Sequence, residues 1–242
     1  MGFIEILQKL WPPPLRQPEL KEYTEEGLSA RQMRDLYRKM RAVESPRPEL
    51  IRPLVAWLEK SIKLIPKTEP IKILNLATGH GGLEDLLANW AEKKDLNFDL
   101  TGVDMSDIAL EVASEVIKGR PNIHFKKDDV RHLTEKDDSF HFVISNNLVH
   151  HLSKDELQQV LKEALRIARY GIYCLDPLRC RWGIRVVGFL ARHEPLIQHE
   201  AVISYRRSFV PEELQSIVKQ INPRLSVQSE FPWFLSIQTN LG

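Results

Sequence analysis

A glycine-rich turn and several acidic residues are the parts of this sequence that could bind a nucleotide-like ligand. The apolar run 71–76 leads into Ala77-Thr-Gly-His-Gly-Gly82, and a helical pattern follows at once. Glycine lets the backbone turn tightly and approach a ligand, so such turns follow the first strand of many ligand-binding α/β folds. The turn departs from a strict G-x-G-x-x-G pattern, and by itself it fits a purely structural connection about as well.

Acidic residues close the next two apolar runs of the chain. Asp104 ends the second run, where a carboxylate can accept hydrogen bonds from both hydroxyls of a ribose. Asp128 and Asp129 follow the third run, where a carboxylate can accept from an adenine amine while Val130 packs against the ring. Taken singly, each acid fits a helix cap or a turn even better, so the prediction depends on the strand ends taken together.

A fourth apolar run, residues 140–146, ends in a polar cluster. The carboxyl ends of parallel strands meet at one edge of a sheet, and nucleotide-like ligands bind there. We therefore predict that a nucleoside-containing cofactor lies across these ends. The residues expected to contact it are Asn75, Ala77, Thr78, Gly79, Gly81, Asp104, Met105, Asp128, Asp129, Val130, Ser145 and Asn146.

Over roughly residues 71–240 the chain resembles the class I S-adenosylmethionine-dependent methyltransferases. The order of the motifs separates it from a dehydrogenase. The resemblance implies S-adenosyl-L-methionine as the cofactor and a Rossmann-like methyltransferase fold. The motifs are Asn75-Leu-Ala-Thr-Gly-His-Gly81, Gly102-Val-Asp-Met-Ser106, Asp129-Val-Arg-His-Leu133 and the stretch 139–152.

Three positions depart from the pattern of this family. Asn75 stands where an acid is usual, Ala77 where glycine is usual, and His141 where aspartate is usual. Asn75 can still support the turn and accept a hydrogen bond from the cofactor amine through its amide oxygen. His141 is expected to cost only a structural hydrogen bond.

The order of several further pieces carries a narrower resemblance. These pieces are residues 77–81, 148–152, 166–173, 205–214 and 231–234. They resemble small bacterial methyltransferases encoded beside type III polyketide synthases. That resemblance implies a phenolic or pyrone hydroxyl, often on an alkylated molecule, as the methyl acceptor. The expected reaction is O-methylation of a phenolic, pyrone or quinol-like small molecule.

The acceptor is expected over the carboxyl ends of the fourth and fifth strands. Methyl transfer is an in-line displacement, so the enzyme mainly aligns the nucleophile with the sulfonium and excludes water. A phenol is a poor nucleophile until it loses its proton, and histidine is well suited to take that proton. We predict His150 or His151 as the catalytic base, with His151 favoured, although either can instead hold the loop. Further acceptor-site candidates are Asn146, Asn147, Asp176 and Arg179.

Strand and helix patterns alternate regularly from residue 70, which predicts an α/β fold with a doubly wound, mostly parallel seven-stranded sheet. The last two strands flank a short turn and must form an antiparallel C-terminal hairpin. We expect residues 1–69 to form an N-terminal helical lid and residues 70–242 the S-adenosylmethionine-binding domain. Strands are expected near 71–76, 98–104, 122–127, 140–146, 170–175, 225–231 and 233–239, and helices near 82–94, 106–118, 153–169, 179–192 and 211–221.

The region before residue 70 is predicted to be helical. Ser29-Ala-Arg-Gln32 is a capping box, and apolar residues follow it at helical spacing. The opposite face of this helix is basic, and we expect it to be exposed to solvent. A second apolar stripe contains Pro53, which is expected to start or kink its helix. The resemblance implies that these helices cover the cofactor and help to wall the acceptor pocket. Residues 1–11 fit a short covering helix or an interfacial anchor.

The segment 178–202 is long for a connection and combines apolar residues with arginines. Apolar side chains at helical spacing can line a pocket for an aromatic or alkyl acceptor, or simply face the core. The arginines can steer an acidic group or touch anionic lipid heads. The apolar residues concerned are Trp182, Val186, Phe189 and Leu190.

Composition agrees with a small-molecule enzyme. A chain of 242 residues that is 43% hydrophobic can bury one substantial core, and its net charge of +1 gives no general attraction to nucleic acid. Cys174 and Cys180 are expected to be free thiols. No metal site is predicted, although His150 and His151 are residues of a type that can bind a metal ion. No apolar run approaches the ~20 residues needed to span a bilayer. We expect a cytoplasmic enzyme; peripheral membrane contact and the oligomeric state stay open.

Two other functions also fit the sequence. An RNA or protein methyltransferase would use the basic helices and the arginines at 206–207, but it is disfavoured by the near-neutral charge. The lack of an Asn-Pro-Pro-Tyr-type amine-binding motif after the fourth strand disfavours it further. A cofactor-binding but non-catalytic partner protein is suggested by Asn75, Ala77 and His141.

Overall fold

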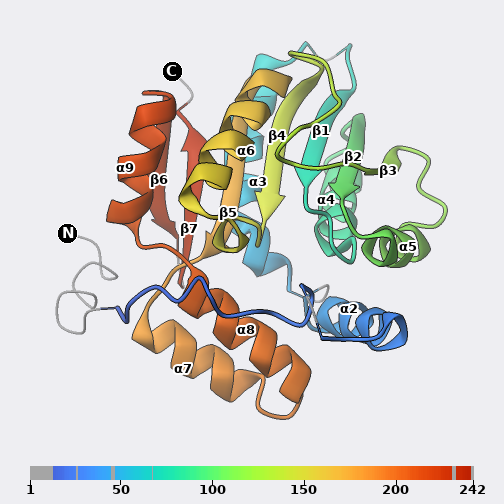
Figure 1. Cartoon of the computed structure of the whole chain (residues 1–242). Coiled ribbons are helices and arrows are strands. Elements are labelled where there is room, and N and C mark those ends of the chain that lie inside the picture. The colour runs from blue at the N-terminus through green and yellow to red at the C-terminus, as the bar shows by residue number, and fades with distance from the viewer. Residues whose placement is uncertain (1–12, 26, 45–46, 67, 231–232, 241–242) are drawn as a thin grey trace.

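The centre of the molecule is a seven-stranded sheet with the strand order β3-β2-β1-β4-β5-β7-β6, as the computed structural model shows (Figure 1). The structure describes residues 13–25, 27–44, 47–66, 68–230 and 233–240, so the predictions for residues 1–11 and for the turn at 231–232 lie outside it. Every predicted strand end agrees to within two residues. The strands are β1 (Ile71–Leu76), β2 (Phe98–Asp104), β3 (Ile123–Lys127), β4 (Phe140–Asn146), β5 (Ala168–Pro177), β6 (Leu225–Glu230) and β7 (Phe234–Thr239).

The sheet is parallel except at β7. This strand pairs antiparallel with both β5 and β6, whereas β1 to β5 pair in parallel. The mostly parallel sheet and the antiparallel C-terminal hairpin are thereby confirmed. Because β1, β2 and β4 run in one direction, Asn75, Asp104 and Asn146 come to the same edge of the sheet.

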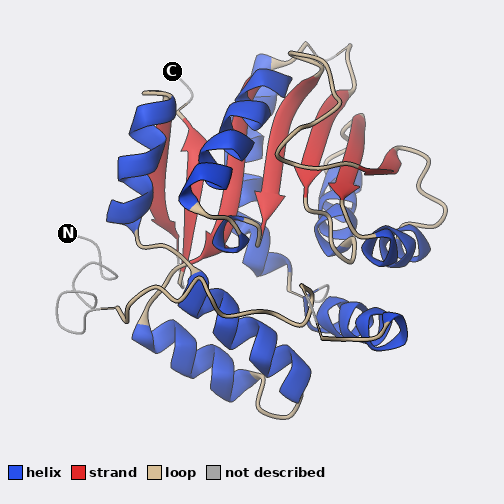
Figure 2. Cartoon of the chain, viewed as in Figure 1, coloured by secondary structure: helices blue, strands red, loops and turns tan. Residues whose placement is uncertain are grey.

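Helices cover both faces of the sheet, which gives the doubly wound architecture (Figure 2). On one face, α6 and α9 bury residues such as Leu161 and Leu214. On the other, α3 and α4 bury residues such as Trp57 and Leu87, and the Trp57 ring meets Phe142 edge-on at 5.4 Å. The helices are α2 (Ala30–Glu44), α3 (Arg52–Ser61), α4 (Gly82–Lys93), α5 (Asp107–Val116), α6 (Lys154–Ile167), α7 (Arg181–Leu190), α8 (Pro195–Arg207) and α9 (Pro211–Ile221), with 3₁₀ turns η1 (Pro48–Ile51), η2 (Ile62–Leu64) and η3 (Val149–His151).

Helix α2 lies outside these layers and packs on α5. The predicted capping box is present: Gln32 N–H donates to Ser29 Oγ (3.4 Å), and Ser29 N–H donates to Gln32 Oε1 (3.0 Å). Tyr37 is buried against α5. The basic face, expected to be solvated, meets acids of α5, with Arg34 Nη2 2.6 Å from Glu111 Oε2. Such exposed ion pairs contribute little, so the apolar contact provides most of the attachment.

Helices α7 and α8 form a hairpin beside the carboxyl edge of the sheet (Figure 1). The predicted helix at 179–192 corresponds to α7, but α8 was not predicted. The buried side of α8 includes Glu200 and Arg207 as well as Ile197 and Ile203. The charged residues interrupt the apolar ones on its buried side, so hydrophobic periodicity does not reveal this helix.

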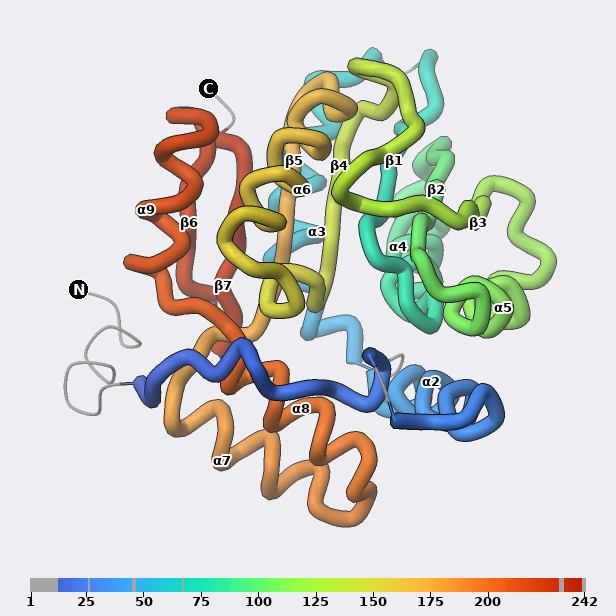
Figure 3. Tube along the Cα trace, in the orientation of Figure 1, coloured from blue at the N-terminus to red at the C-terminus, as the bar shows by residue number. Residues whose placement is uncertain are grey.

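The N-terminal segment 13–25 crosses between the α7–α8 hairpin and the sheet (Figure 3). Arg16 Nε donates to the carbonyl of Arg207 (2.6 Å), and the Tyr23 ring stacks on His199 with centroids 4.2 Å apart. These contacts hold an irregular segment in a fixed place at the carboxyl edge. Over the described part of the chain, no helix is both long and apolar enough to cross a bilayer.

Candidate functional site

A cavity of about 780 Å³ lies at the carboxyl edge of the sheet. Its volume is in the range of small-molecule binding sites. The glycine turn and the strand ends form one side, and α2, η1, η3, α7 and α8 contribute to the rest. Eight of the twelve predicted cofactor residues line it: Asn75, Ala77, Thr78, Gly79, Asp104, Met105, Val130 and Asn146.

Asp104 fixes the position of the glycine turn at the wall of the cavity through hydrogen bonds to the backbone. The Gly79 N–H donates to Asp104 Oδ2 (2.9 Å), and the Ser106 N–H donates to Oδ1 (2.8 Å). Burial raises the pKa of the Asp104 carboxyl, and these hydrogen bonds, which lower it, offset the increase only in part. Gly79 has a φ of 56°, and a Cβ there would have no neighbour within 4 Å. Ala77 adopts the same φ of 56°, a left-handed conformation that favours glycine.

A buried acid, Glu84, lies below the turn. It lies beside Asn75, the amide that stands where the family usually has an acid. The Asn75 Nδ2 and the Thr78 hydroxyl each donate to Glu84 Oε1 at 2.7 Å. Burial raises the pKa of this carboxyl. The Asn75 Oδ1 is buried and has no partner in the described structure. Glu84 was missed because its place in the first turn of α4 fits an ordinary helix-dipole residue.

The third group of predicted acids lies beside the cavity without lining it. Asp128 accepts from the Thr134 N–H (3.1 Å) and hydroxyl (2.8 Å). Asp129 accepts from Arg131 Nε (3.0 Å) and Nη2 (2.9 Å). Val130 and Arg131 line the cavity instead, so the contact between a carboxylate and adenine stays a prediction. Gly81 and Ser145 also lie outside the lining.

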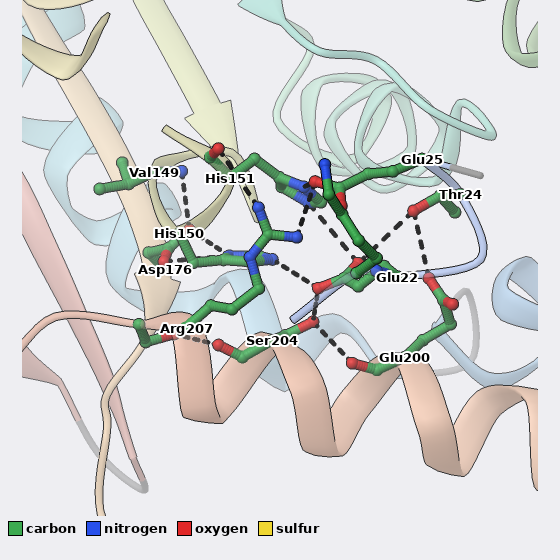
Figure 4. A network of polar contacts seen from close by, with 12 residues as sticks. Glu22, Thr24, Glu25, Val149, His150, His151, Asp176, Glu200, Ser204 and Arg207 are labelled. Carbon is green, nitrogen blue, oxygen red and sulfur yellow. Dashed lines mark hydrogen bonds and ion pairs between the residues drawn. The ribbon is translucent and has the colours of Figure 1, made fainter. Parts of the chain in front are cut away.

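His150 is clamped between two carboxylates and is 1% exposed (Figure 4). Its Nδ1 lies 3.1 Å from both oxygens of Asp176, and its Nε2 lies 3.1 Å from Glu22 Oε1. Burial alone lowers the pKa of His150, but Asp176 and Glu22 outweigh it and raise the pKa to about 10. With both ring nitrogens engaged, His150 is poorly placed to take a proton from a substrate.

His151 is half-buried and lines the cavity. Its Nδ1 lies 2.9 Å from Glu25 Oε1, which also accepts from Arg207 Nη1 (2.6 Å). Its Nε2 is 3.6 Å from Glu22 Oε2, beyond hydrogen-bond distance. This arrangement orients the ring and leaves Nε2 available, so His151 is the better candidate for the base.

A carboxyl from α8, that of Glu200, completes the network in Figure 4. Glu200 accepts from the Tyr23 N–H (2.6 Å) and from the Thr24 hydroxyl (3.2 Å). Burial and the nearby Glu22 carboxylate raise the pKa of Glu200 to about 7. Ser204 donates to Glu22 Oε1 at 2.8 Å.

The other acceptor-site candidates divide into two groups. Asn146 and Asn147 line the cavity. Asp176 and Arg179 do not: Asp176 contacts Nδ1 of His150, and Arg179 forms an ion pair with Glu213 at 2.6 Å. Val186 and Leu190 also line the cavity. Trp182 and Phe189 were expected either to line a pocket or to face the core, and they do neither: they do not line the cavity, and they are 43% and 61% exposed.

Other predictions concern residues away from the cavity. His141 is buried and accepts from the Lys72 N–H at 3.0 Å, a structural contact. Cys174 and Cys180 are free and buried, as expected. Glu22, Glu25 and Glu200 were not predicted as site residues. No motif marks them, because they reach the site only through the docking of residues 13–25 on α8.

Residues 73–171 match the family described as a methyltransferase domain. No curated protein sequence matches the chain. The family match covers the glycine turn, Asp104 and both candidate histidines.

Solved structures share the fold at low sequence identity. A SAM-dependent methyltransferase from Aquifex aeolicus is 16% identical with a TM-score of 0.58, over 88% of this chain and 98% of that one. Magnesium protoporphyrin IX methyltransferase from Synechocystis PCC 6803, with bound SAH, is 16% identical with a TM-score of 0.54, over 79% and 82%. The CMeT domain of the citrinin polyketide synthase is 17% identical with a TM-score of 0.59, over 75% and 49%, so this chain spans about half of its length.

Proposed function

We propose that this chain, whose residues 73–171 match a methyltransferase domain, uses S-adenosylmethionine to methylate a hydroxyl group of a small, partly apolar molecule. A phenol, pyrone or quinol, with or without an alkyl chain, is the acceptor class that we favour. The observation that carries the proposal is that one cavity joins the glycine turn to His151 and to apolar walls from α7 and α8.

The residues at the turn fit S-adenosylmethionine. Asp104 can accept from the ribose hydroxyls, and the open space at Gly79 allows close approach of a ligand. The unpartnered Asn75 Oδ1 can accept from the amino group of the cofactor, which would satisfy a buried polar atom. The bound cofactor supplies a methyl group on a sulfonium, an electrophile that needs no further activation.

The acceptor side of the cavity supports a molecule with an apolar part. Leu50, Val186, Val187, Leu190 and Ile197 contribute to this side, from η1, α7 and α8. Apolar walls with a few convergent polar groups are typical of small-molecule sites. A large RNA would instead need an open basic surface. One neighbour is named for a polyketide synthase and another for a porphyrin. The likeness of fold therefore does not choose between acceptors.

His151 is proposed to take the hydroxyl proton of the acceptor. His151 lines the cavity, and Glu25 at Nδ1 would stabilise the ring once it is protonated. His150 would hold η3 in place through Asp176 and Glu22. The surrounding apolar side chains would exclude water while the acceptor oxygen approaches the methyl carbon.

The N-terminal region is proposed to act as a lid. Glu22, Tyr37, Met40 and Ile51 all line the cavity, and they precede residue 70. The cavity is therefore closed by elements outside the predicted S-adenosylmethionine-binding domain. An acceptor would reach its position only with this region in place.

The proposal is tested by incubating the full chain with S-adenosylmethionine and a panel of alkylated phenols, pyrones and quinols. S-adenosylhomocysteine release and the mass and fragmentation of the product would show O-methylation. Methylation of RNA or of a peptide, with none of the hydroxyl acceptors, would refute it. S-adenosylmethionine binding detected by calorimetry, with no methylation of any acceptor class, would favour a cofactor-binding but non-catalytic partner protein.

A further inference from the structure

Three potential metal-ligating atoms meet in the wall of the cavity. They belong to Glu22, His150 and His151, and all lie within 4.8 Å of one another. We propose that these three side chains form a binding site for a divalent transition-metal ion of the zinc class. Two imidazoles and a carboxylate suit such an ion better than Mg²⁺ or Ca²⁺, which prefer oxygen ligands.

The spacing of the atoms comes near to that of one coordination sphere. His150 Nε2 is 3.1 Å from Glu22 Oε1, and His151 Nε2 is 3.6 Å from the other oxygen, Oε2. Two ligand atoms that are each about 2.1 Å from a tetrahedral ion are about 3.4 Å apart. One atom from each of the three side chains lies within 4.8 Å of the others, so the side chains would have to move closer together around an ion.

Both histidines already carry the support that metal-ligating histidines have. A carboxylate contacts Nδ1 of each ring: Asp176 at 3.1 Å from His150, and Glu25 at 2.9 Å from His151. In a metal site, a carboxylate at one ring nitrogen fixes the tautomer and orients the other nitrogen toward the ion. Here the other nitrogen of each ring is the Nε2 that faces Glu22.

The local charge also favours a cation. Three carboxylates surround the two rings, those of Glu22, Glu25 and Asp176. Arg207 pairs with Glu25 at 2.6 Å. The charges of Glu22 and Asp176 remain. A divalent ion would balance both, whereas a single proton on His150 balances only one. Ser204, which donates to Glu22 Oε1 at 2.8 Å, would hold the carboxylate in place.

The proposed ion would keep a position open to the cavity. All three ligands line the cavity, and three protein ligands with one open position are the pattern of catalytic rather than structural zinc sites. If the proposed function is correct, the acceptor oxygen would bind at that position and lose its proton to solvent, because a bound ion lowers the pKa of a hydroxyl. In the ion-loaded enzyme this would replace proton transfer to His151.

The test uses the tag-free full chain, treated with a chelator and then titrated with Co²⁺ alone, without cofactor or acceptor. We expect one equivalent of cobalt to bind, with the visible absorption of a four- or five-coordinate ion that zinc abolishes. Glu22→Gln and His151→Asn should each weaken binding at least tenfold. Glu25→Gln should weaken it by about 10–100-fold. His132→Asn, at an exposed histidine that contacts Gln159, should change nothing.

Circular dichroism of each variant establishes whether it is folded. If Glu22→Gln does not fold, His151→Asn still tests the site. Cobalt that binds without the visible bands, or equally well to folded His151→Asn, would refute the site. Because the titration involves neither cofactor nor acceptor, its failure leaves O-methylation untouched. Conversely, a cobalt site in a protein that methylates no hydroxyl would refute only the proposed function.

Discussion

Nε2 of His150 lies 3.1 Å from Oε1 of Glu22, although 128 residues separate them along the chain. The contact joins the N-terminal segment to η3, directly after β4. Both side chains are almost fully buried. Through this contact the N-terminal segment brings Glu22, Thr24 and Glu25 to the wall of the cavity.

Replacing Glu22 by Ala should destabilise the protein strongly. Removing one partner leaves the charge of His150 buried and half-paired, and such losses cost about 3–5 kcal/mol. Urea unfolding followed by circular dichroism, with chelator present, would measure the difference. Glu19→Ala, at an exposed acid in the same segment, is the control and should be close to wild type. Equal midpoints for the two variants would mean that Arg16 and Tyr23 suffice to dock the segment.

Glu200 should make stability depend on pH. Burial and the Glu22 carboxylate raise the pKa of Glu200 to about 7, from an ordinary value of 4.5. The folded state therefore binds more protons than the unfolded state between pH 4.5 and 7, and stability falls as pH rises through that window. The loss should be on the order of 2 kcal/mol.

Glu200→Gln should remove the part of this dependence that comes from Glu200, because glutamine does not titrate. The fall in stability above about pH 6.5 that comes from His150, whose pKa is raised to about 10, should remain in the variant. The measurement is urea unfolding of wild type and variant from about pH 5 to about pH 7.5, in chelator. The difference between the two curves isolates Glu200 from Glu25, whose lowered pKa acts only at lower pH. Glu212→Gln, at an exposed acid of α9, should leave the wild-type slope unchanged. A flat wild-type curve would contradict the buried, protonated carboxyl.

Asp104→Asn should weaken S-adenosylmethionine binding by about 1–3 kcal/mol, or roughly 5- to 150-fold in Kd. Asparagine keeps the shape but loses the charge and offers one acceptor oxygen instead of two. Calorimetry on the folded variant checks the value. Asp107→Asn removes an exposed acid three residues further on, which pairs with Lys127, and should not change the affinity. An unaltered affinity in Asp104→Asn would remove the ribose assignment.

Much of the fold could be predicted because its strands are buried apolar runs bounded by turn residues. The bounds of β1, β2 and β4 were found without error: β1 ends at the glycine turn, and β2 and β4 end at the polar residues Asp104 and Asn146. Helix α8 escaped prediction because Glu200 and Arg207 interrupt its buried stripe. Glu22 escaped because a pairing across 128 residues leaves no local pattern. Residue spacing predicts which strand ends meet; it does not predict which loop docks on them.

Enlarging Val187 should damage acceptor binding without affecting the cofactor. Val187 lines the apolar side of the cavity, whereas Phe189, two residues further on, is 61% exposed and does not. Val187→Phe should lower kcat/KM for the acceptor by roughly tenfold or more. The Kd of S-adenosylmethionine should stay within twofold in the same calorimetric assay.

Phe189→Ala is the matched control, and its kinetics should equal those of wild type. Equal damage from the two changes would show that the outer face of α7 takes part in acceptor binding. No damage from Val187→Phe would place the acceptor elsewhere in the cavity.

His151→Asn should lower kcat by about 10²–10⁴-fold, the usual cost of removing a general base. The defect should shrink as pH rises, because the acceptor then ionises without help. His132→Asn, at an exposed histidine, should keep wild-type rates. The loss is expected whether His151 takes the proton or holds an ion that ionises the acceptor. Chelation separates these cases, since it would abolish wild-type activity only if the ion is required. If His151→Asn keeps its rate at every pH, alignment of acceptor and cofactor is the whole of the catalysis.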